Sequence, residues 1–143
     1  MAEGLVTIPR RGLVGQLLSY ALVGLLSNMA GYFVYLIITH FGVGPKVTMT
    51  VLYFLGAYIG FWGNRRITFK HEDRGMAVGF RYMLAHSVGY LMNFMLLYVL
   101  VDRLGYPHQL AQAFSIVVVA VFLFVSFRYF VFPSSTLSVK GQP

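Results

Sequence analysis

Residues 61–69 read FWGNRRITF, and residues 124–132 read FVSFRYFVF. Each stretch lies at the end of an apolar segment and places an arginine between two phenylalanines. The first has Phe61, Arg65 and Phe69, and the second has Phe124, Arg128 and Phe132, each 63 positions after its counterpart. The same offset pairs Tyr35 with Tyr98 and Gly42 with Gly105. Recurrence at a fixed offset predicts one membrane unit that occurs twice and a basic site that is built twice.

The composition around these stretches is that of a membrane protein. Of 143 residues, 58% are hydrophobic and only 10% are charged, whereas a soluble domain carries roughly 25% charged residues. The apolar residues form long blocks, which is typical of spanning helices. There is no cysteine, so disulfides and thiolate metal sites are excluded. The net charge of +7 fits lysines and arginines retained on one side of a membrane.

Four segments are candidates for spanning helices of about 20 residues, namely 13–39, 47–63, 80–101 and 110–131. We expect an all-α integral membrane fold in which two helical hairpins form parallel repeats, at about 13–69 and 80–132. The four-helix domain would cover residues 13–133, between an N-terminal tail (1–12) and a flexible C-terminal tail (134–143). The second segment is the shortest, but it is strongly apolar.

The distribution of cations predicts the orientation. Nine of the eleven lysines and arginines fall on one side of the predicted spans, and only Lys46 and Arg103 fall on the other. The side with more cations is expected to be cytoplasmic, so both termini lie inside. Because each repeat holds two helices, the repeats share one orientation, and their symmetry axis runs along the membrane normal.

Polar residues recur at helical spacing within the spans. The first span carries Asn28 and Tyr35 on one face, and the third carries Tyr82, His86 and Asn93. Both asparagines are expected near the middle of the bilayer, where an amide must find a partner. They either form hydrogen bonds between helices that stabilise the bundle or line a polar path. His86 either bonds a neighbour or takes part in proton coupling, and a lone histidine is no metal site.

The arginines are the sharpest candidates for binding. Arg128 lies four residues before Phe132, so we expect it about 6 Å inside the helix end and in need of an anion. No acidic residue lies inside any span. A phosphate is a suitable partner, because guanidinium presents a planar fork to its oxygens. The alternative is that an arginine only sets the orientation in the membrane and extends its side chain to the water interface. We favour this for Arg66 but not for Arg65 and Arg128.

No catalytic constellation is present. The chain offers no carboxylate pair, no nucleophile with a base and no glycine-rich phosphate loop, so we expect neither an enzyme nor a cofactor. The basic residues are divided between membrane edges rather than gathered in one domain, which argues against nucleic acid as a partner.

These motifs resemble the GtrA-like family. The resemblance covers about residues 15–133 and rests on the early Gly-x-x-x-Asn (24–28), on NRRITF (64–69) and on RYFVF (128–132). One departure is Phe127, where many members have an asparagine before the arginine, as Asn64 stands before Arg65 here. The second half-site is therefore altered or asymmetric.

The resemblance implies a role in cell-surface polysaccharide synthesis in the bacterial cytoplasmic membrane. Members are proposed to flip a polyprenyl-phosphate-linked sugar from the inner to the outer leaflet. The phosphate would then meet Arg65 and Arg128, with Asn64 and Arg66 beside them. The sugar would pass a polar path containing Asn28, Asn93, Tyr35 and His86.

Other functions remain open. The chain is alternatively a membrane anchor that recruits a glycosyltransferase through residues 70–79 or 134–143. A small multidrug-type exporter is a weaker alternative, because such exporters use an intramembrane glutamate that this chain lacks. A four-helix unit encloses little room, so we also expect a homodimer joined through the small residues Gly56 and Gly60, with the path between subunits.

Overall fold

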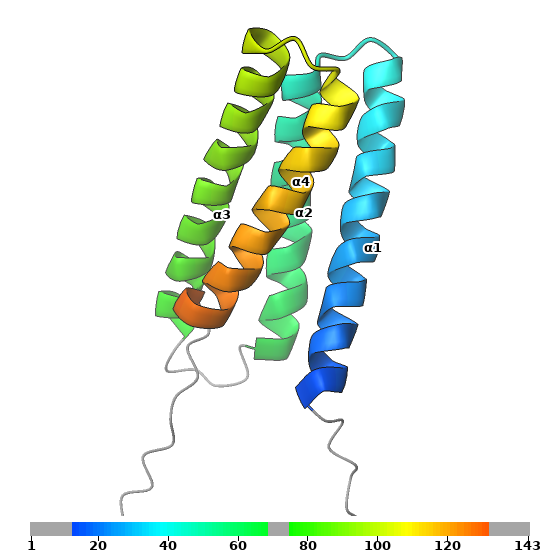
Figure 1. The fold of residues 1–143 in the computed structure, drawn as a ribbon. Coiled ribbons are helices and arrows are strands. Elements are labelled where there is room, and N and C mark those ends of the chain that lie inside the picture. Colours follow the sequence, from blue (N-terminus) through cyan, green and yellow to red (C-terminus); the bar gives the residue numbers. More distant parts are fainter. Residues whose placement is uncertain (1–12, 69–74, 132–143) are drawn as a thin grey trace, which may run out of the picture.

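The computed structural model describes residues 13–68 and 75–131, and all of them outside the turns are helical (Figure 1). The four helices are α1 (Leu13–His40), α2 (Pro45–Thr68), α3 (Gly75–Leu97) and α4 (His108–Ser126). A π-helical segment extends α3 as η1 (Tyr98–Arg103), and another extends α4 as η2 (Phe127–Val131). The described part of the chain thus has the expected all-α, four-helix architecture. The predicted tails, 1–12 and 134–143, lie outside the described residues.

The helices run alternately up and down, so the bundle has two distinct ends (Figure 1). The turns at 41–44 and 104–107 lie at one end, here named the loop end. The start of α1 and the end of η2 lie at the other, here named the termini end. In the loop-end turns, Gly42 and Gly105 have φ values of 90° and 71°, a left-handed conformation that only glycine adopts without strain. The glycines that the 63-residue offset pairs thus share a backbone conformation.

Three of the helices are long and apolar enough to cross a membrane: Ala21–His40, Met76–Arg103 and His108–Val131. The last is the most apolar, with a mean hydropathy of 2.5. α2 is also long, with 24 residues, but it is less apolar than the sequence analysis assumed. Lys46, Thr48 and Thr50 stand near its start, and Asn64, Arg65 and Arg66 stand near its end.

The core is divided between the two ends of the bundle. At the loop end, all four helices contribute to one buried cluster, with Tyr35, Met49, Leu97 and Ala111 at its centre. At the termini end, the buried residues Tyr82, Ala85 and Val131 come only from α3 and η2. Residues 21–30 of α1 are all exposed. Figure 1 shows the reason: α4 leans from α1 at the loop end toward α3 at the termini end.

Tyrosines supply the hydrogen bonds that tie α2 to α3. The hydroxyl of Tyr53 donates to the carbonyl of His86 at 2.9 Å, and that of Tyr82 donates to the carbonyl of Ala57 at 3.3 Å. Tyr82 is therefore a buried core residue. A tyrosine suits this role because its ring packs while its hydroxyl satisfies a backbone group.

Gly89 makes room for one of these tyrosines, and its replacement should destabilise the bundle. A Cβ at position 89 would lie 2.6 Å from Tyr53 Oη. We expect Gly89→Ala to cost about 1–3 kcal/mol, as overpacking does, measured as a lower Tm in detergent. Gly24→Ala is the matched control, because a Cβ there meets nothing within 4 Å. Equal Tm values for the two variants would show that Tyr53 is not held against Gly89.

Candidate functional site

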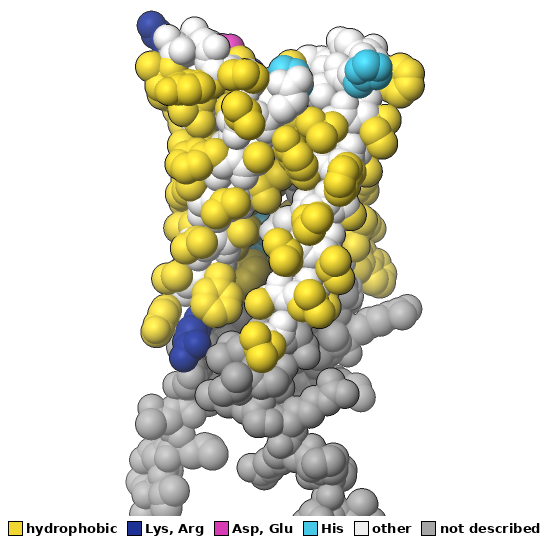
Figure 2. Space-filling view, turned by 45° about the vertical axis from the view of Figure 1, so that its right-hand side comes forward, with side chains coloured by type: hydrophobic (Ala, Val, Ile, Leu, Met, Phe, Trp, Pro, Cys, Tyr) yellow, Lys and Arg dark blue, Asp and Glu magenta, His cyan; other side chains and the backbone are white. Residues whose placement is uncertain are grey.

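A cavity of about 280 Å³ lies between the four helices. On the face that α1 and α4 share, Figure 2 shows a hollow between two ridges of hydrophobic side chains. Every helix contributes to the lining, which is made of Ser27, Asn28, Gly31, Tyr32, Tyr35, Met49, Leu52, Tyr53, Gly56, Ala57, His86, Asn93, Gln112, Ile116, Val119, Ala120 and Leu123. This position follows from the lean of α4, which leaves a wedge between α1 and α4.

Two hydrogen bonds close the wedge at the loop end. Tyr32 donates its hydroxyl proton to the carbonyl of Gln109 at 2.9 Å, and the hydroxyl of Tyr35 shares a hydrogen bond with Nδ1 of His108 at 3.1 Å. Nearer the termini end, the α1 residues that line the cavity are exposed, among them Asn28. The cavity therefore has a closed end at these tyrosines and a lateral mouth beside Asn28.

The cavity wall is mainly apolar, with several polar side chains and, among the described residues, no charged one. Asn93 and Gln112 are only 4% and 5% exposed. Their oxygens Oδ1 and Oε1, and both ring nitrogens of His86, are buried without a hydrogen-bond partner among the described residues. An unpaired buried polar group costs about 1–3 kcal/mol. Three such groups around one cavity favour a binding role over a structural one.

Aromatic rings hold His86 in this position. Its ring centroid lies 4.4 Å from that of Tyr82, 5.9 Å from that of Tyr53 and 5.5 Å from that of Phe127. The simple expectation that His86 hydrogen-bonds a neighbour through its side chain is not met within the described residues. Packing rather than hydrogen bonding fixes the imidazole.

The structure brings together four of the residues that the sequence indicated, because Asn28, Tyr35, His86 and Asn93 all line the cavity. Neither asparagine hydrogen-bonds another helix in the described part of the chain. The two asparagines therefore do not occupy equivalent positions. Asn28 is exposed at the mouth, whereas Asn93 is buried.

Sequence reasoning missed Gln112 and Tyr53. Gln112 is an amide inside the most apolar predicted span, and the argument used for Asn93, that an amide within a span needs a partner, applies to it as well. Tyr53 gave no such signal, because tyrosine is common in membrane helices and only the fold places it beside His86. Both residues lie on the second helix of a hairpin, whereas the polar stripes were sought on the first.

The predicted arginines lie between the cavity and the termini end. Arg128 is exposed rather than buried within the chain, its guanidinium lies 5.8 Å from the ring centroid of Tyr129, and it does not line the cavity. It stands five residues, or about 7.5 Å of helix rise, beyond Leu123, the last cavity residue of α4. Asn64, Arg65 and Arg66 belong to the last turns of α2, and their side chains lie outside the described part of the structure.

Arg81 is a further cation at the termini end. It donates from Nη1 to the carbonyl of Phe130 at 3.3 Å, and its guanidinium lies 5.6 Å from the ring centroid of that residue. In the sequence, Arg81 counted only toward the topology. The structure shows that it ties α3 to η2.

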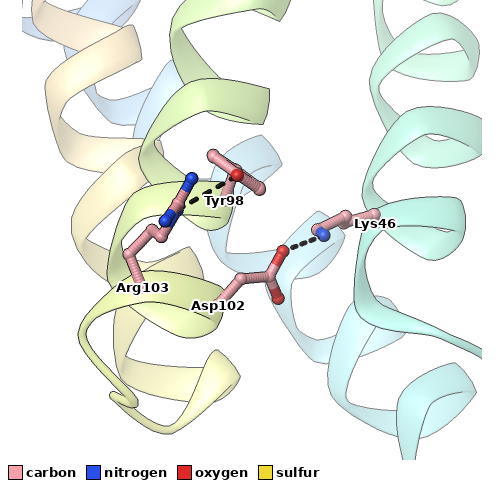
Figure 3. Close-up of polar contacts among 4 residues, drawn as sticks. All are labelled: Lys46, Tyr98, Asp102 and Arg103. Carbon is pink, nitrogen blue, oxygen red and sulfur yellow. Dashed lines mark hydrogen bonds and ion pairs between the residues drawn. The ribbon is translucent and has the colours of Figure 1, made fainter.

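Opposite charges meet at the loop end (Figure 3). Lys46 at the start of α2 forms an ion pair with Asp102 of η1 and lies 5.3 Å from the ring centroid of Tyr98. Arg103 donates from Nε to the hydroxyl of Tyr98 at 3.1 Å. Exposed ion pairs contribute only about 0–1 kcal/mol to stability. The importance of this pair lies in its position, because it joins the two hairpins where the cavity is closed.

Comparison with known proteins gives one match. The family model described as GtrA/DPMS, transmembrane domain, matches residues 19–132, which include the helices that form the cavity. Neither the curated proteins nor the solved structures compared with the chain give a match.

Proposed function

The chain belongs to the GtrA/DPMS transmembrane domain family, and from that premise we propose that it moves a polyprenyl-phosphate-linked sugar from one membrane leaflet to the other. The family makes it a multi-pass membrane protein of glycan synthesis, related to the handling of polyprenyl-linked sugars. The observation that carries the proposal is the uncharged cavity, with its buried polar side chains and its lateral mouth between α1 and α4.

The shape of the cavity suits such an amphiphile. Its volume of about 280 Å³ is near the lower end of the roughly 300–1,000 Å³ of ligand pockets, which favours one small headgroup. The mouth opens sideways, where exposed apolar side chains of α1 and α4 face lipid. The polyprenyl tail can therefore stay in the bilayer while the sugar enters. The polar side chains in the cavity wall lower the cost of removing its hydroxyl groups from water.

The arginines supply a place for the phosphate. Arg65 and Arg128 belong to helix ends on the termini side of the cavity, within about 8–12 Å of helix rise from its nearest lining residues on α2 and α4. We place this end in the cytoplasm, at the inner membrane of a bacterium, because most of the lysines and arginines lie there. A phosphate held at this level leaves the sugar at the mouth beside Asn28.

We expect Arg65→Ala and Arg128→Ala each to weaken binding of a polyprenyl phosphate by about tenfold, since a charge-assisted hydrogen bond contributes about 1.5–3 kcal/mol. Arg66→Ala should have a smaller effect, and Arg103→Ala, at the loop end, should have none. Native mass spectrometry with titrated lipid measures these affinities. If all four variants bind like the parent, the arginines set topology only.

Translocation by the purified protein tests the proposal directly. Vesicles containing the protein and a labelled polyprenyl-phosphate sugar should expose that sugar on the opposite leaflet faster than protein-free vesicles. The competing function is a membrane anchor for a glycosyltransferase. It predicts no acceleration, together with co-purification of the enzyme.

A homodimer remains a separate proposal, because the cavity lies within one chain. At Gly60 a Cβ would approach the Tyr82 hydroxyl to 2.9 Å, and Gly56 lines the cavity. Gly60 thus packs against Tyr82 inside the subunit, whereas a Cβ at Gly56 would meet nothing within 4 Å. The mass of the protein in mild detergent distinguishes monomer from dimer.

A further inference from the structure

We propose that His86, Asn93 and Gln112 form a recognition site for the hydroxyl groups of an uncharged sugar, and that this site selects neutral sugars over uronates and amino sugars. The inference rests on the proposed function and deepens it by naming the class of headgroup. Its basis is the set of unpartnered polar groups inside the cavity.

The three side chains come from two helices and lie along the length of one cavity. His86 and Asn93 are seven residues apart on α3, two helical turns, and so lie on one face. Gln112 comes from α4, the helix that packs most extensively against α3. All three line the same cavity, and all three have buried polar atoms without a partner among the described residues. The fold thus keeps three unsatisfied groups around one space.

The hydrogen-bond donors and acceptors of these three side chains indicate which class of ligand they can bind. The unpartnered oxygens of Asn93 and Gln112 accept hydrogen bonds, and a neutral imidazole offers one donor and one acceptor. If the oxygen and nitrogen of either side-chain amide exchange places, the buried position still holds a polar atom. The need for a hydrogen-bond partner is therefore the same in both orientations. Adjacent hydroxyl groups meet this need, since each one donates and accepts. A sugar ring presents several of them at fixed spacing.

The absence of charge along the cavity wall explains the selectivity. No lysine, arginine, aspartate or glutamate belongs to the lining among the described residues. A carboxylate or an ammonium group buried there would lose its hydration without gaining a counter-ion, at a cost of several kcal/mol. A hydroxyl group loses much less. The phosphate of the same lipid avoids this cost because it stays with the arginines outside the cavity.

The test compares lipids that differ only in the headgroup. Native mass spectrometry measures binding of polyprenyl phosphates that carry glucose, a deoxyglucose or glucuronate, and of bare polyprenyl phosphate. The parent should bind the glucose lipid about tenfold more tightly than the bare or glucuronate lipid. In Gln112→Leu, the ratio of the two affinities should fall toward one, while the affinity for bare polyprenyl phosphate stays unchanged. Gln109→Leu, the same exchange at an exposed position of α4, should keep the preference.

The deoxyglucose lipid separates recognition from packing. If Gln112 bonds a hydroxyl, the penalty of Gln112→Leu should shrink for the lipid that lacks that hydroxyl. A loss that is equal for all four lipids would show a structural role and overturn the inference. A gain in Tm with unchanged binding of every lipid would show that the polar groups only hold water, which also overturns it. Binding preference without translocation would reject the proposed function while keeping this site.

Discussion

Gly31→Leu should nearly stop translocation while leaving the bundle folded. Gly31 lines the mouth of the cavity, and a Cβ at this position meets nothing within 4 Å. A leucine side chain fits at this position without displacing its neighbours, but it occupies the space through which the headgroup enters. Forcing a ligand against added methyl groups costs about 1–3 kcal/mol, or roughly five- to hundredfold in occupancy. Initial rates of sugar exposure in proteoliposomes measure the effect.

Gly24→Leu is the matched control for this experiment. Gly24 lies two turns earlier on the same face of α1, is equally open and does not line the cavity. Both variants replace a helical glycine, so both should gain about 0.5–1 kcal/mol of helix propensity rather than lose stability. Equal transport by the two would mean that the headgroup does not pass Gly31.

Locking the loop end should also stop transport, and the lock should be reversible. In this structure the hairpins are joined there by Lys46 and Asp102 (Figure 3), and α1 is joined to α4 by Tyr32 and Tyr35. A headgroup that enters at Asn28 can leave on the other side only if this end separates. A short, cleavable bifunctional thiol reagent applied to Lys46→Cys/Asp102→Cys should therefore reduce the rate to that of protein-free vesicles.

The cross-linking reaction is specific, because the native chain contains no cysteine. Only the introduced pair can react, and each single variant serves as the control. Cleaving the reagent should restore the rate of the untreated double variant. Full transport in the linked state would show that the loop end stays closed throughout the cycle. The headgroup would then have to cross by another route.

Much of the fold was predictable from patterning alone. Long apolar blocks separated by short turns predicted four helices, and Gly42 and Gly105 mark the two turns at the loop end. The polarity of α2 was underestimated, because the predicted span, 47–63, left out Lys46 and the two arginines, Arg65 and Arg66, which belong to the helix. The π-helical segments η1 and η2 gave no sequence signal.

The candidate site was only partly predictable. Asn28, Tyr35, His86 and Asn93 stood out because polar residues at helical spacing are rare in membrane spans. Which of them would be paired depends on the lean of α4, and no helical periodicity encodes that lean. Periodicity therefore could not show that Asn93 is buried without a partner while Asn28 is exposed. The same lean explains why Gln112 joins them.

Protection of a single cysteine in the cavity tests most directly whether this cavity receives the headgroup. Ala120 lines the cavity on α4, and Ala120→Cys adds only one atom. In proteoliposomes, a small water-soluble thiol reagent should label this cysteine, and a saturating polyprenyl-phosphate sugar should slow the labelling at least about tenfold. Val117→Cys, which points away from the cavity on the same helix, should show no sugar-dependent change. If the lipid-linked sugar binds at saturation and Ala120→Cys reacts at an unchanged rate, the headgroup does not enter the cavity.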